Sequence, residues 1–497
     1  MRASGILMPV FSLPSRYGIG SFSKSAYQFV DMLKKAGQKY WQILPLCPTS
    51  YGDSPYQSFS TYAGNPYFID LDQLIEEKLL TRKECQACDF GDDPQDIDYG
   101  KLYESRFKLL RKAYERANVG EDQEFEAYRR ENAWWLDDYA LFMAVKDRFD
   151  GVAWNEWAED IRLRWSNAMD YYRRELYYEI EFYSYLQFVF MKQWKKLKNY
   201  ANINGIEIIG DIPIYVAFDS ADAWANPELF QFDSENLPTA VAGCPPDGFS
   251  ADGQLWGNPL YRWDYHRETG FDWWIRRIAY CSELYDVVRI DHFRGFDEYY
   301  AIPYGDTTAR NGHWEKGPGI ALFEAAKNRL GELNIIAEDL GYITDSVKKL
   351  VADSGFPGMK VLEFAFDSRE KSDYLPYTYE KNSVVYTGTH DNETIAGWYA
   401  GLDKSDLKMC TDYMNIDRIP GKEYHWDFIR LAMLSVSDLC VIPIQDYLGL
   451  DNRARINHPS TLGTNWRWRL AKGQLSASLL KEIREMTRIS GRLQNGE

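Results

Sequence analysis

Short apolar runs recur along this chain of 497 residues and give its first structural expectation. Eight of them are rich in β-branched and aromatic side chains, and several end in a polar or acidic group. Runs this short and this apolar are typical of parallel strands that are buried on both faces. The eight predicted strands occupy residues 5–10, 40–46, 206–216, 286–291, 334–339, 360–366, 383–391 and 440–446.

Amphipathic stretches lie between these runs and predict helices at residues 24–37, 271–285, 318–331, 344–355 and 428–439. Gly37 suits the position just after a helix end, and Thr344 suits an N-cap. We also expect Pro318 in the first turn of its helix, where a missing N–H costs little. The segment after Leu470 predicts a short terminal helix.

Strands that alternate with helices favour an α/β fold of the (β/α)8 TIM barrel type, because parallel neighbours need a crossover helix. A doubly wound open sheet fits the same alternation and is the alternative. The gap between the second and third runs is much longer than a crossover requires, and it contains further helical stretches. We therefore predict one barrel unit over residues 1–497. It has a mostly helical insertion at about 50–200 and a loop excursion with little regular pattern at about 217–265.

The chain is acidic, with a formal net charge of −17. Nucleic acids and anionic membranes bind clustered Lys and Arg, so we expect neither as a partner, whereas a neutral partner is compatible. Aromatic residues make up 16% of the chain; their faces suit sugars, but they also fill ordinary cores. No segment approaches the ~20 apolar residues of a membrane span, and the N-terminus lacks the features of a signal peptide, so we expect a cytoplasmic protein.

The seven cysteines are odd in number and scattered, which argues against a disulfide framework. Cys85 and Cys88 form one C-x-x-C pair, but no second pair completes a zinc site. The chain also lacks a G-x-S-x-G elbow, a Walker loop and a G-x-G-x-x-G motif after a strand. The serine hydrolase and nucleotide-binding interpretations are weakened accordingly.

Acidic side chains gather where the predicted strands end, which in a barrel is the edge that carries the active site. They are Asp211, Asp291, Glu338 with Asp339, Asp391 and Asp446. Carboxylates are costly to bury, so a structural role alone rarely requires so many of them. Any single one could still be a helix cap or one half of an ion pair.

The segment VRIDHFRGF at 288–296 is the most specific. Arg289 lies two residues before Asp291, so both side chains project from the same face of a strand. An adjacent guanidinium keeps a carboxylate ionised, as a nucleophile requires; a buried structural ion pair is the alternative. His292 and Arg294 begin the following loop, where they either meet a ligand or brace the turn.

Glu338 and Asp339 are consecutive in IIAEDLG, so only one of them is expected to face the barrel centre. The longer Glu338 suits proton delivery. If it lies near ionised Asp291, repulsion between the two carboxyl groups raises the pKa of Glu338 and keeps it protonated.

The segment YTGTHDNET at 386–394 offers His390 and Asp391 after a strand. Together with His292 they could bind a metal, but no metal-ligand spacing supports that interpretation. A clamp for sugar hydroxyls is the better hypothesis. As a purely structural alternative, Thr394 or Asn392 caps the helix that follows.

The segments VRIDHFRGF, AEDLG and YTGTHDNET, in this order, resemble the catalytic segments of the α-amylase clan of glycoside hydrolases. More closely, the chain resembles family 77, the 4-α-glucanotransferases. Further matching segments lie at 40–67, 210–224, 245–263, 357–367 and 457–469, so that the resemblance covers about residues 5–470. One departure is Cys47, where the family more often has Gly; it leaves the local loop conformation in doubt.

The resemblance implies a barrel with large insertions near its mouth, no C-terminal β-domain, no cofactor and no metal. Asp291 would be the nucleophile, Glu338 the general acid/base and Asp391 the stabiliser of the transition state, and Asp446 would be structural. The residues implied to bind substrate are Tyr56, Asp211, Trp256, Arg289, His292, His390 and Asn465.

The implied activity is retaining transfer of an α-1,4-glucan segment from a malto-oligosaccharide to the 4-hydroxyl of an acceptor. Malto-oligosaccharides, glucans derived from starch or glycogen, and glucose as acceptor would be the partners. A retaining pair of carboxyl groups lies ~5–5.5 Å apart. Aromatic-rich loops at 51–67 and 245–263 could keep water from the site. Two alternatives remain open, an α-glucan hydrolase of the same clan and a glucan-binding protein without activity.

Overall fold

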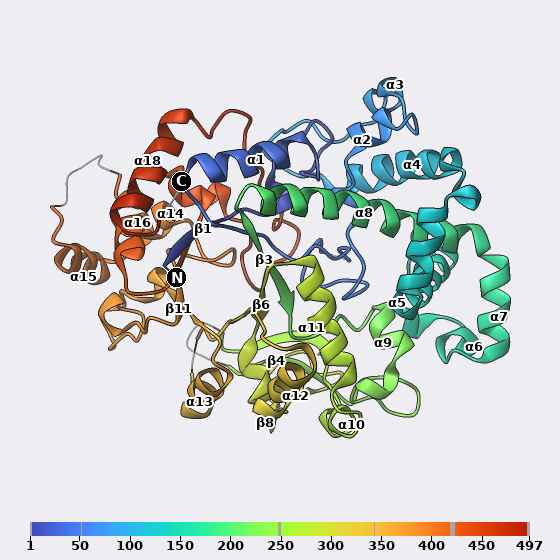
Figure 1. Ribbon diagram of the computed structural model, residues 1–497. Coiled ribbons are helices and arrows are strands. Elements are labelled where there is room, and N and C mark those ends of the chain that lie inside the picture. The colour runs from blue at the N-terminus through green and yellow to red at the C-terminus, as the bar shows by residue number, and fades with distance from the viewer. Residues whose placement is uncertain (1, 51, 247–249, 342, 418–422, 495–497) are drawn as a thin grey trace.

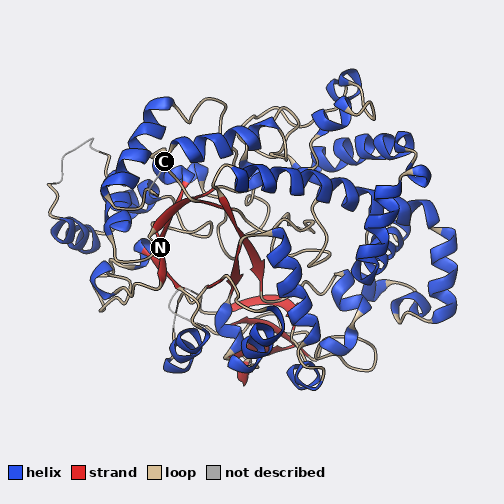
Figure 2. Ribbon diagram, viewed as in Figure 1, coloured by secondary structure: helices blue, strands red, loops and turns tan. Residues whose placement is uncertain are grey.

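The computed structural model describes residues 2–50, 52–246, 250–341, 343–417 and 423–494. Its centre is a closed barrel of eight parallel strands, seen as a ring of strands in Figure 2. The barrel strands are β1 (Ala3–Leu7), β2 (Tyr40–Gln42), β3 (Glu207–Pro213), β6 (Val287–Asp291), β9 (Ile335–Ala337), β10 (Gly358–Val361), β11 (Ser383–Tyr386) and β12 (Leu439–Pro443). Every predicted run overlaps one of them, and the TIM barrel prediction is confirmed.

The barrel closes between its first and last strands. Strand β1 pairs with β12 from Ala3 opposite Leu439 to Leu7 opposite Pro443, and it pairs with β2 on its other side. The open-sheet alternative is therefore wrong. Most predicted strands extended too far at their carboxyl ends. For example, β11 ends at Tyr386, and β12 is followed at once by the short helix α17 (Ile444–Tyr447).

Helices surround the barrel, as Figure 1 shows. They include α1 (Lys24–Lys35), α11 (Asp272–Leu284), α12 (Ile320–Leu330), α13 (Asp345–Ser354), α14 (Ile395–Gly401), α15 (Lys404–Met414), α16 (His425–Leu434) and α18 (Ala477–Ile489). The predicted Thr344 cap is confirmed, because its hydroxyl accepts a bond from Val347 N. Gly37 lies just past α1 with φ 68°, also as predicted. Pro318 was placed wrongly, since α12 begins only after Gly319.

The long gap between β2 and β3 is mostly helical. It contains α2 (Leu71–Glu76), α3 (Arg82–Gln86), α4 (Tyr99–Ala117), α5 (Gln123–Arg148), α6 (Glu159–Arg162), α7 (Ser166–Glu175) and α8 (Tyr177–Ile203). Helices α5 and α8 pack along each other, and α8 also contacts α1 and β3. In Figure 1 these helices extend to one side of the barrel.

A second, four-stranded antiparallel sheet lies beside the barrel. Its order is β5 (Gln254–Pro259), β4 (Ala240–Cys244), β7 (Glu298–Pro303) and β8 (His313–Lys316). The hydrophobic pattern did not predict this sheet, because strands such as β5 and β8 are partly exposed and do not form continuous apolar runs. The predicted loop excursion at about 217–265 contains β4, β5, the short helix α9 (Ala221–Ala225) and the start of α10 (Trp263–Glu268). Residues 51 and 247–249 of the two aromatic-rich loops lie outside the described residues.

Over the described ranges, the structure has no helix that is both long and apolar enough to cross a membrane. The seven cysteines are free thiols, Cys85 and Cys88 included. Cys47 lies in the loop that follows β2, and its thiol is 3.8 Å from the Thr61 carbonyl.

Candidate active site

Three of the predicted acids lie at or beyond the carboxyl ends of the barrel strands β6, β9 and β11, of which β6 and β9 are neighbours. Asp291 is the last residue of β6, and Glu338 directly follows β9, the strand that pairs with β6. Asp391 lies five residues beyond the end of β11. Side chains at this end of a barrel face the region where active sites are built.

Arg289 is the centre of a buried network of charges. It pairs in register with Asp211 of the adjacent strand β3. Its Nη1 donates to both carboxylate oxygens of Asp211 at 2.7 Å, and its Nη2 donates to Asp291 Oδ1 at 3.0 Å. The Tyr56 hydroxyl donates to Asp211 Oδ2 at 2.8 Å. Asp211 is fully buried, so in this structure it fixes Arg289 and Tyr56 rather than facing open space.

Asp291 is partly accessible, with 30% of its side chain exposed. Burial raises its pKa to about 6, because the charged form loses hydration; the guanidinium of Arg289 opposes this shift, and Asp211 adds to it. The expected contact between Arg289 and Asp291 is confirmed. Arg289 favours the ionised form of Asp291, as expected, but its effect on the pKa is smaller than that of burial.

Glu338 is held by two backbone groups, since His292 N donates to its Oε2 at 2.6 Å and Leu340 N to its Oε1 at 2.9 Å. Burial and then the charge of Asp291 raise the pKa of Glu338 to about 7. Asp339 turns the other way and accepts a bond from Met359 N at 2.7 Å. The prediction that only one of the two consecutive acids faces the centre is confirmed.

Asp391 belongs to a loop and has 43% of its side chain exposed. Asn457 Nδ2 donates to its Oδ1 at 2.6 Å, and His390 Nε2 lies 3.3 Å from the same oxygen. His390 is buried and stacks on the ring of Tyr56, with centroids 5.1 Å apart and planes 13° from parallel.

The structural alternative for this loop holds for Thr394, whose hydroxyl accepts a bond from Gly397 N and caps α14. Asn392 instead accepts bonds from the backbone and hydroxyl of Thr389. Within the described part of the chain, no group of three His, Cys, Asp or Glu side chains is arranged to hold a metal ion. Asp446 is buried, accepts a bond from Ile395 N and is structural.

The rings of His292 and Trp256 pack against each other, and the backbone of His292 contacts Glu338. The two rings meet edge to face with centroids 4.8 Å apart, and Trp256 is partly exposed. Burial, and then Arg294, lower the pKa of His292 to about 3, so its ring is neutral at neutral pH. The backbone of His292 has φ 55°, a left-handed conformation that is uncommon away from glycine.

Asn465 lies in the loop after β12. Its side chain accepts a bond from His458 N and donates to the Thr461 carbonyl at 2.9 Å. In this structure it therefore braces its own loop, and only 9% of it is exposed.

Two residues next to Asp391 were missed in the sequence. Asn457 contacts the carboxylate, and Arg455 Nη2 donates to the Asp391 carbonyl at 2.6 Å. They lie more than sixty residues beyond Asp391 in an irregular loop, where no spacing or periodicity indicates them.

A barrel that holds two interacting carboxyl groups at adjacent strand ends, with a third acid close by, has the site of an enzyme that acts on glycosidic bonds. A family model described as 4-alpha-glucanotransferase, glycoside hydrolase family 77, matches residues 8–475. The chain belongs to this family.

Similar proteins agree over nearly the whole chain. The 4-alpha-glucanotransferase of Clostridium butyricum is 49% identical over 487 residues, which cover 98% of this chain and 100% of that protein. The 4-alpha-glucanotransferase of Thermus thermophilus is 45% identical over 501 residues, covering 99% of each. A solved structure of an amylomaltase from Streptococcus agalactiae in complex with acarbose superposes with a TM-score of 0.96 at 44% identity, covering 99% of this chain and 100% of that one.

Proposed function

We propose that this chain transfers α-1,4-glucan segments between malto-oligosaccharides by a retaining double displacement, with Asp291, Glu338 and Asp391 as its catalytic residues. The observation that carries this proposal is the position of Asp291 and Glu338 at the ends of two paired strands, β6 and β9. Burial and the charge of Asp291 raise the pKa of Glu338, which favours its protonated form as a general acid, while Arg289 favours the ionised form of Asp291 as a nucleophile.

In the first step Asp291 attacks the anomeric carbon of the donor. Arg289 binds Oδ1, so we assign Oδ2 as the attacking oxygen. The bond from the anomeric carbon to the glycosidic oxygen breaks, and that oxygen takes the proton of Glu338. The two N–H groups that face Glu338 then stabilise the carboxylate formed there.

In the second step the 4-hydroxyl of an acceptor glucan or glucose attacks the anomeric carbon from the opposite face. Glu338 accepts the hydroxyl proton, the bond to Asp291 breaks, and an α-1,4 linkage forms again. Asp391 holds sugar hydroxyls of the reacting ring through its exposed carboxylate. The partial negative charge of the three acids stabilises the oxocarbenium-like centre.

The other predicted substrate-binding residues differ in what their side chains contact. Trp256 and His292 are partly exposed and offer ring surfaces to a sugar next to the cleaved bond. His390 and Tyr56 stack on one another beside Asp391. We propose that Asp211 and Asn465 act through the residues that they hold.

We also propose that the helical insertion at about 50–200 and the barrel fold as one cooperative unit. Helix α8 supports it, because it packs on α5 within the insertion and on α1 and β3 of the barrel. The Trp194 ring N–H of α8 also donates to the Leu284 carbonyl at the end of α11. Calorimetry should give one unfolding transition; two separate transitions would contradict a single unit.

Incubation with maltotriose tests the function. Transfer produces glucose together with a ladder of oligosaccharides longer than the substrate, whereas hydrolysis only shortens it. The wild-type chain should give the ladder, and Glu338→Gln should form it at least ~100-fold more slowly. Shortening without elongation would identify a hydrolase instead, and turnover by Glu338→Gln equal to that of the wild type would refute the assigned acid.

A further inference from the structure

We propose that Asn457 and Arg455 are positioning residues that set the direction of the Asp391 carboxylate. The inference rests on the proposed function, because it takes Asp391 to hold sugar hydroxyls. Asp391 lies beyond its strand, so the register of the barrel does not determine where its side chain points.

Asn457 fixes the side chain of Asp391 through one oxygen. Its Nδ2 donates to Oδ1 at 2.6 Å, the same oxygen that His390 Nε2 approaches at 3.3 Å. The backbone N–H of Asn457 also donates to the His390 carbonyl at 3.1 Å. Because both side-chain partners converge on Oδ1, they restrain the rotation of the carboxylate and leave Oδ2 for the sugar hydroxyls that the proposed function assigns to Asp391.

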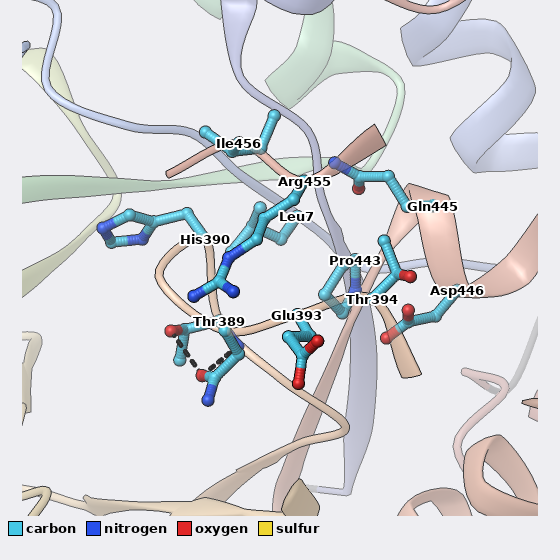
Figure 3. Close-up of a pocket in the computed structure, with 11 residues that line it drawn as sticks. Leu7, Thr389, His390, Glu393, Thr394, Pro443, Gln445, Asp446, Arg455 and Ile456 are labelled. Carbon is cyan, nitrogen blue, oxygen red and sulfur yellow. Dashed lines mark hydrogen bonds between the residues drawn. The ribbon is translucent and has the colours of Figure 1, made fainter. Parts of the chain in front are cut away.

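Arg455 joins the two segments that this contact brings together. Its Nη2 donates to the Asp391 carbonyl at 2.6 Å and its Nε to the Asn457 carbonyl at 2.7 Å. Figure 3 shows its guanidinium pointing to the loop that carries Thr389 and His390, across a small pocket that these residues line. The planar guanidinium donates to both carbonyls at once because its N–H groups have a fixed spacing. The single ammonium group of a Lys cannot reproduce both hydrogen bonds in this geometry.

A purely structural role would predict loss of stability without a specific effect on the reaction. A positioning role predicts a lower kcat with little change in KM, because a displaced Asp391 weakens interactions made in the transition state. Misplacement of a catalytic group by about 1 Å costs ~100-fold in rate. We therefore expect Asn457→Ala to lower kcat for maltotriose transfer by ~10–100-fold, with KM within about threefold of the wild type.

The comparison with Asn457→Asp separates the two roles. The Asp side chain has the same shape and keeps the packing, but it places a second carboxylate against Asp391 Oδ1 in place of a donor. If Asn457 acts by donation, Asn457→Asp is slower than Asn457→Ala; if it acts by packing, Asn457→Asp is the faster of the two, and the proposal is wrong.

Arg455→Lys is expected to lower kcat by ~10-fold, with Arg453→Gln as the matched control. Arg453 lies two residues away, its side chain is 92% exposed and it pairs with Asp451, so its variant should match the wild type. The double variant Arg455→Lys/Asn457→Ala should lose less than the product of the two single effects, because both residues hold the same loop. Multiplicative losses would contradict a shared function.

Melting temperatures measured alongside complete the test. A fall in kcat explained by a lower folded fraction, or kcat of Asn457→Ala within twofold of the wild type, would overturn the positioning role. A wild-type chain that forms no maltotriose ladder would instead overturn the proposed function, so the two failures are distinct.

Discussion

The two sides of the active site hold their acids by different means. On the side of β6 and β9, Asp291 and Glu338 are carried by paired strands, and their environment is set by burial, by each other and by Arg289. On the side of β11, Asp391 is carried by a loop and is more exposed. Its direction depends on hydrogen bonds from the distant segment that contains Asn457.

The difference separates two requirements of the reaction. In the proposed reaction one member of the strand-borne pair delivers a proton and the other forms a covalent bond. Burial beside a second carboxyl group raises the pKa of the proton donor, Glu338, and Arg289 favours the ionised form of the nucleophile, Asp291. The loop-borne acid needs only a fixed direction and a permanent charge. Substitutions on the strand side should therefore affect proton transfer and bond formation directly. Substitutions on the loop side should affect only the orientation of Asp391 towards the substrate.

The largest effect is expected on the strand side. Asp291→Asn removes the attacking oxygen's charge and should lower kcat/KM for maltotriose by ~10⁴-fold or more. Asp339→Asn is the matched control, because Asp339 faces β10 and an amide oxygen can still accept the bond from Met359 N. Initial rates of glucose release measure both. Equal losses of kcat/KM in the two variants would contradict the assignment of Asp291, rather than Asp339, to the reaction.

Stability should show the next largest effect. Asp211→Ala leaves Arg289 buried without its main partner, which costs ~3–5 kcal/mol of the free energy of unfolding. Denaturation by urea measures it. The control is Asp264→Ala, which breaks a pair in which the Asp264 side chain is 93% exposed and should leave the unfolding midpoint unchanged. An unchanged midpoint for Asp211→Ala would show that the buried pair contributes nothing.

The pH dependence of kcat/KM should be bell-shaped. The rate falls as the pH drops through the pKa of Asp291, near 6, because the nucleophile becomes protonated. It also falls as the pH rises through the pKa of Glu338, near 7, because the acid loses its proton. Each limb changes about tenfold per pH unit and belongs to the coupled pair. Residual activity of Glu338→Gln should lack the basic limb; its persistence would assign that limb to another group.

The smallest effect is expected in the loop after β12 that carries Arg455 and Asn457. Ser460 is exposed and has φ 63°, a conformation that costs a side chain about 1–2 kcal/mol and glycine much less. Ser460→Gly should therefore raise the free energy of unfolding by ~0.5–1 kcal/mol, after the entropy of glycine is subtracted. Ser460→Ala keeps the Cβ atom and should show no gain. A gain of equal size in Ser460→Ala would exclude relief of backbone strain as the cause.

The sequence predicted the strand side of the site much better than the loop side. Alternation along a strand placed Arg289 and Asp291 on one face, and it separated Glu338 from Asp339. The contact of Arg289 with Asp211 could not be predicted in the same way, because it depends on the register between β3 and β6. The hydrogen bond from Asn457 to Asp391 depends on how two irregular loops pack against each other, and irregular loops have no sequence periodicity from which to predict it.

The fold shows the same division. Continuous apolar runs located all eight barrel strands, because a strand buried on both faces has few polar positions. The sheet of β4, β5, β7 and β8 escaped prediction, because its strands are partly exposed and their pattern is weak. The ends of helices and strands were predicted less accurately than their positions. Strand β11 ends earlier and helix α12 begins later than the sequence pattern predicted.

The closure of the barrel between β1 and β12 has a consequence for biosynthesis. Ala3 leaves the ribosome long before its partner Leu439 exists, and at ~5–20 residues per second the interval is on the order of 20–90 s. During that time the outer edge of β1 has unpaired backbone groups of the kind that promote association between nascent chains. Because Asp391 and Asn457 lie on either side of β12 in the sequence, catalytic competence is acquired only in the last part of translation.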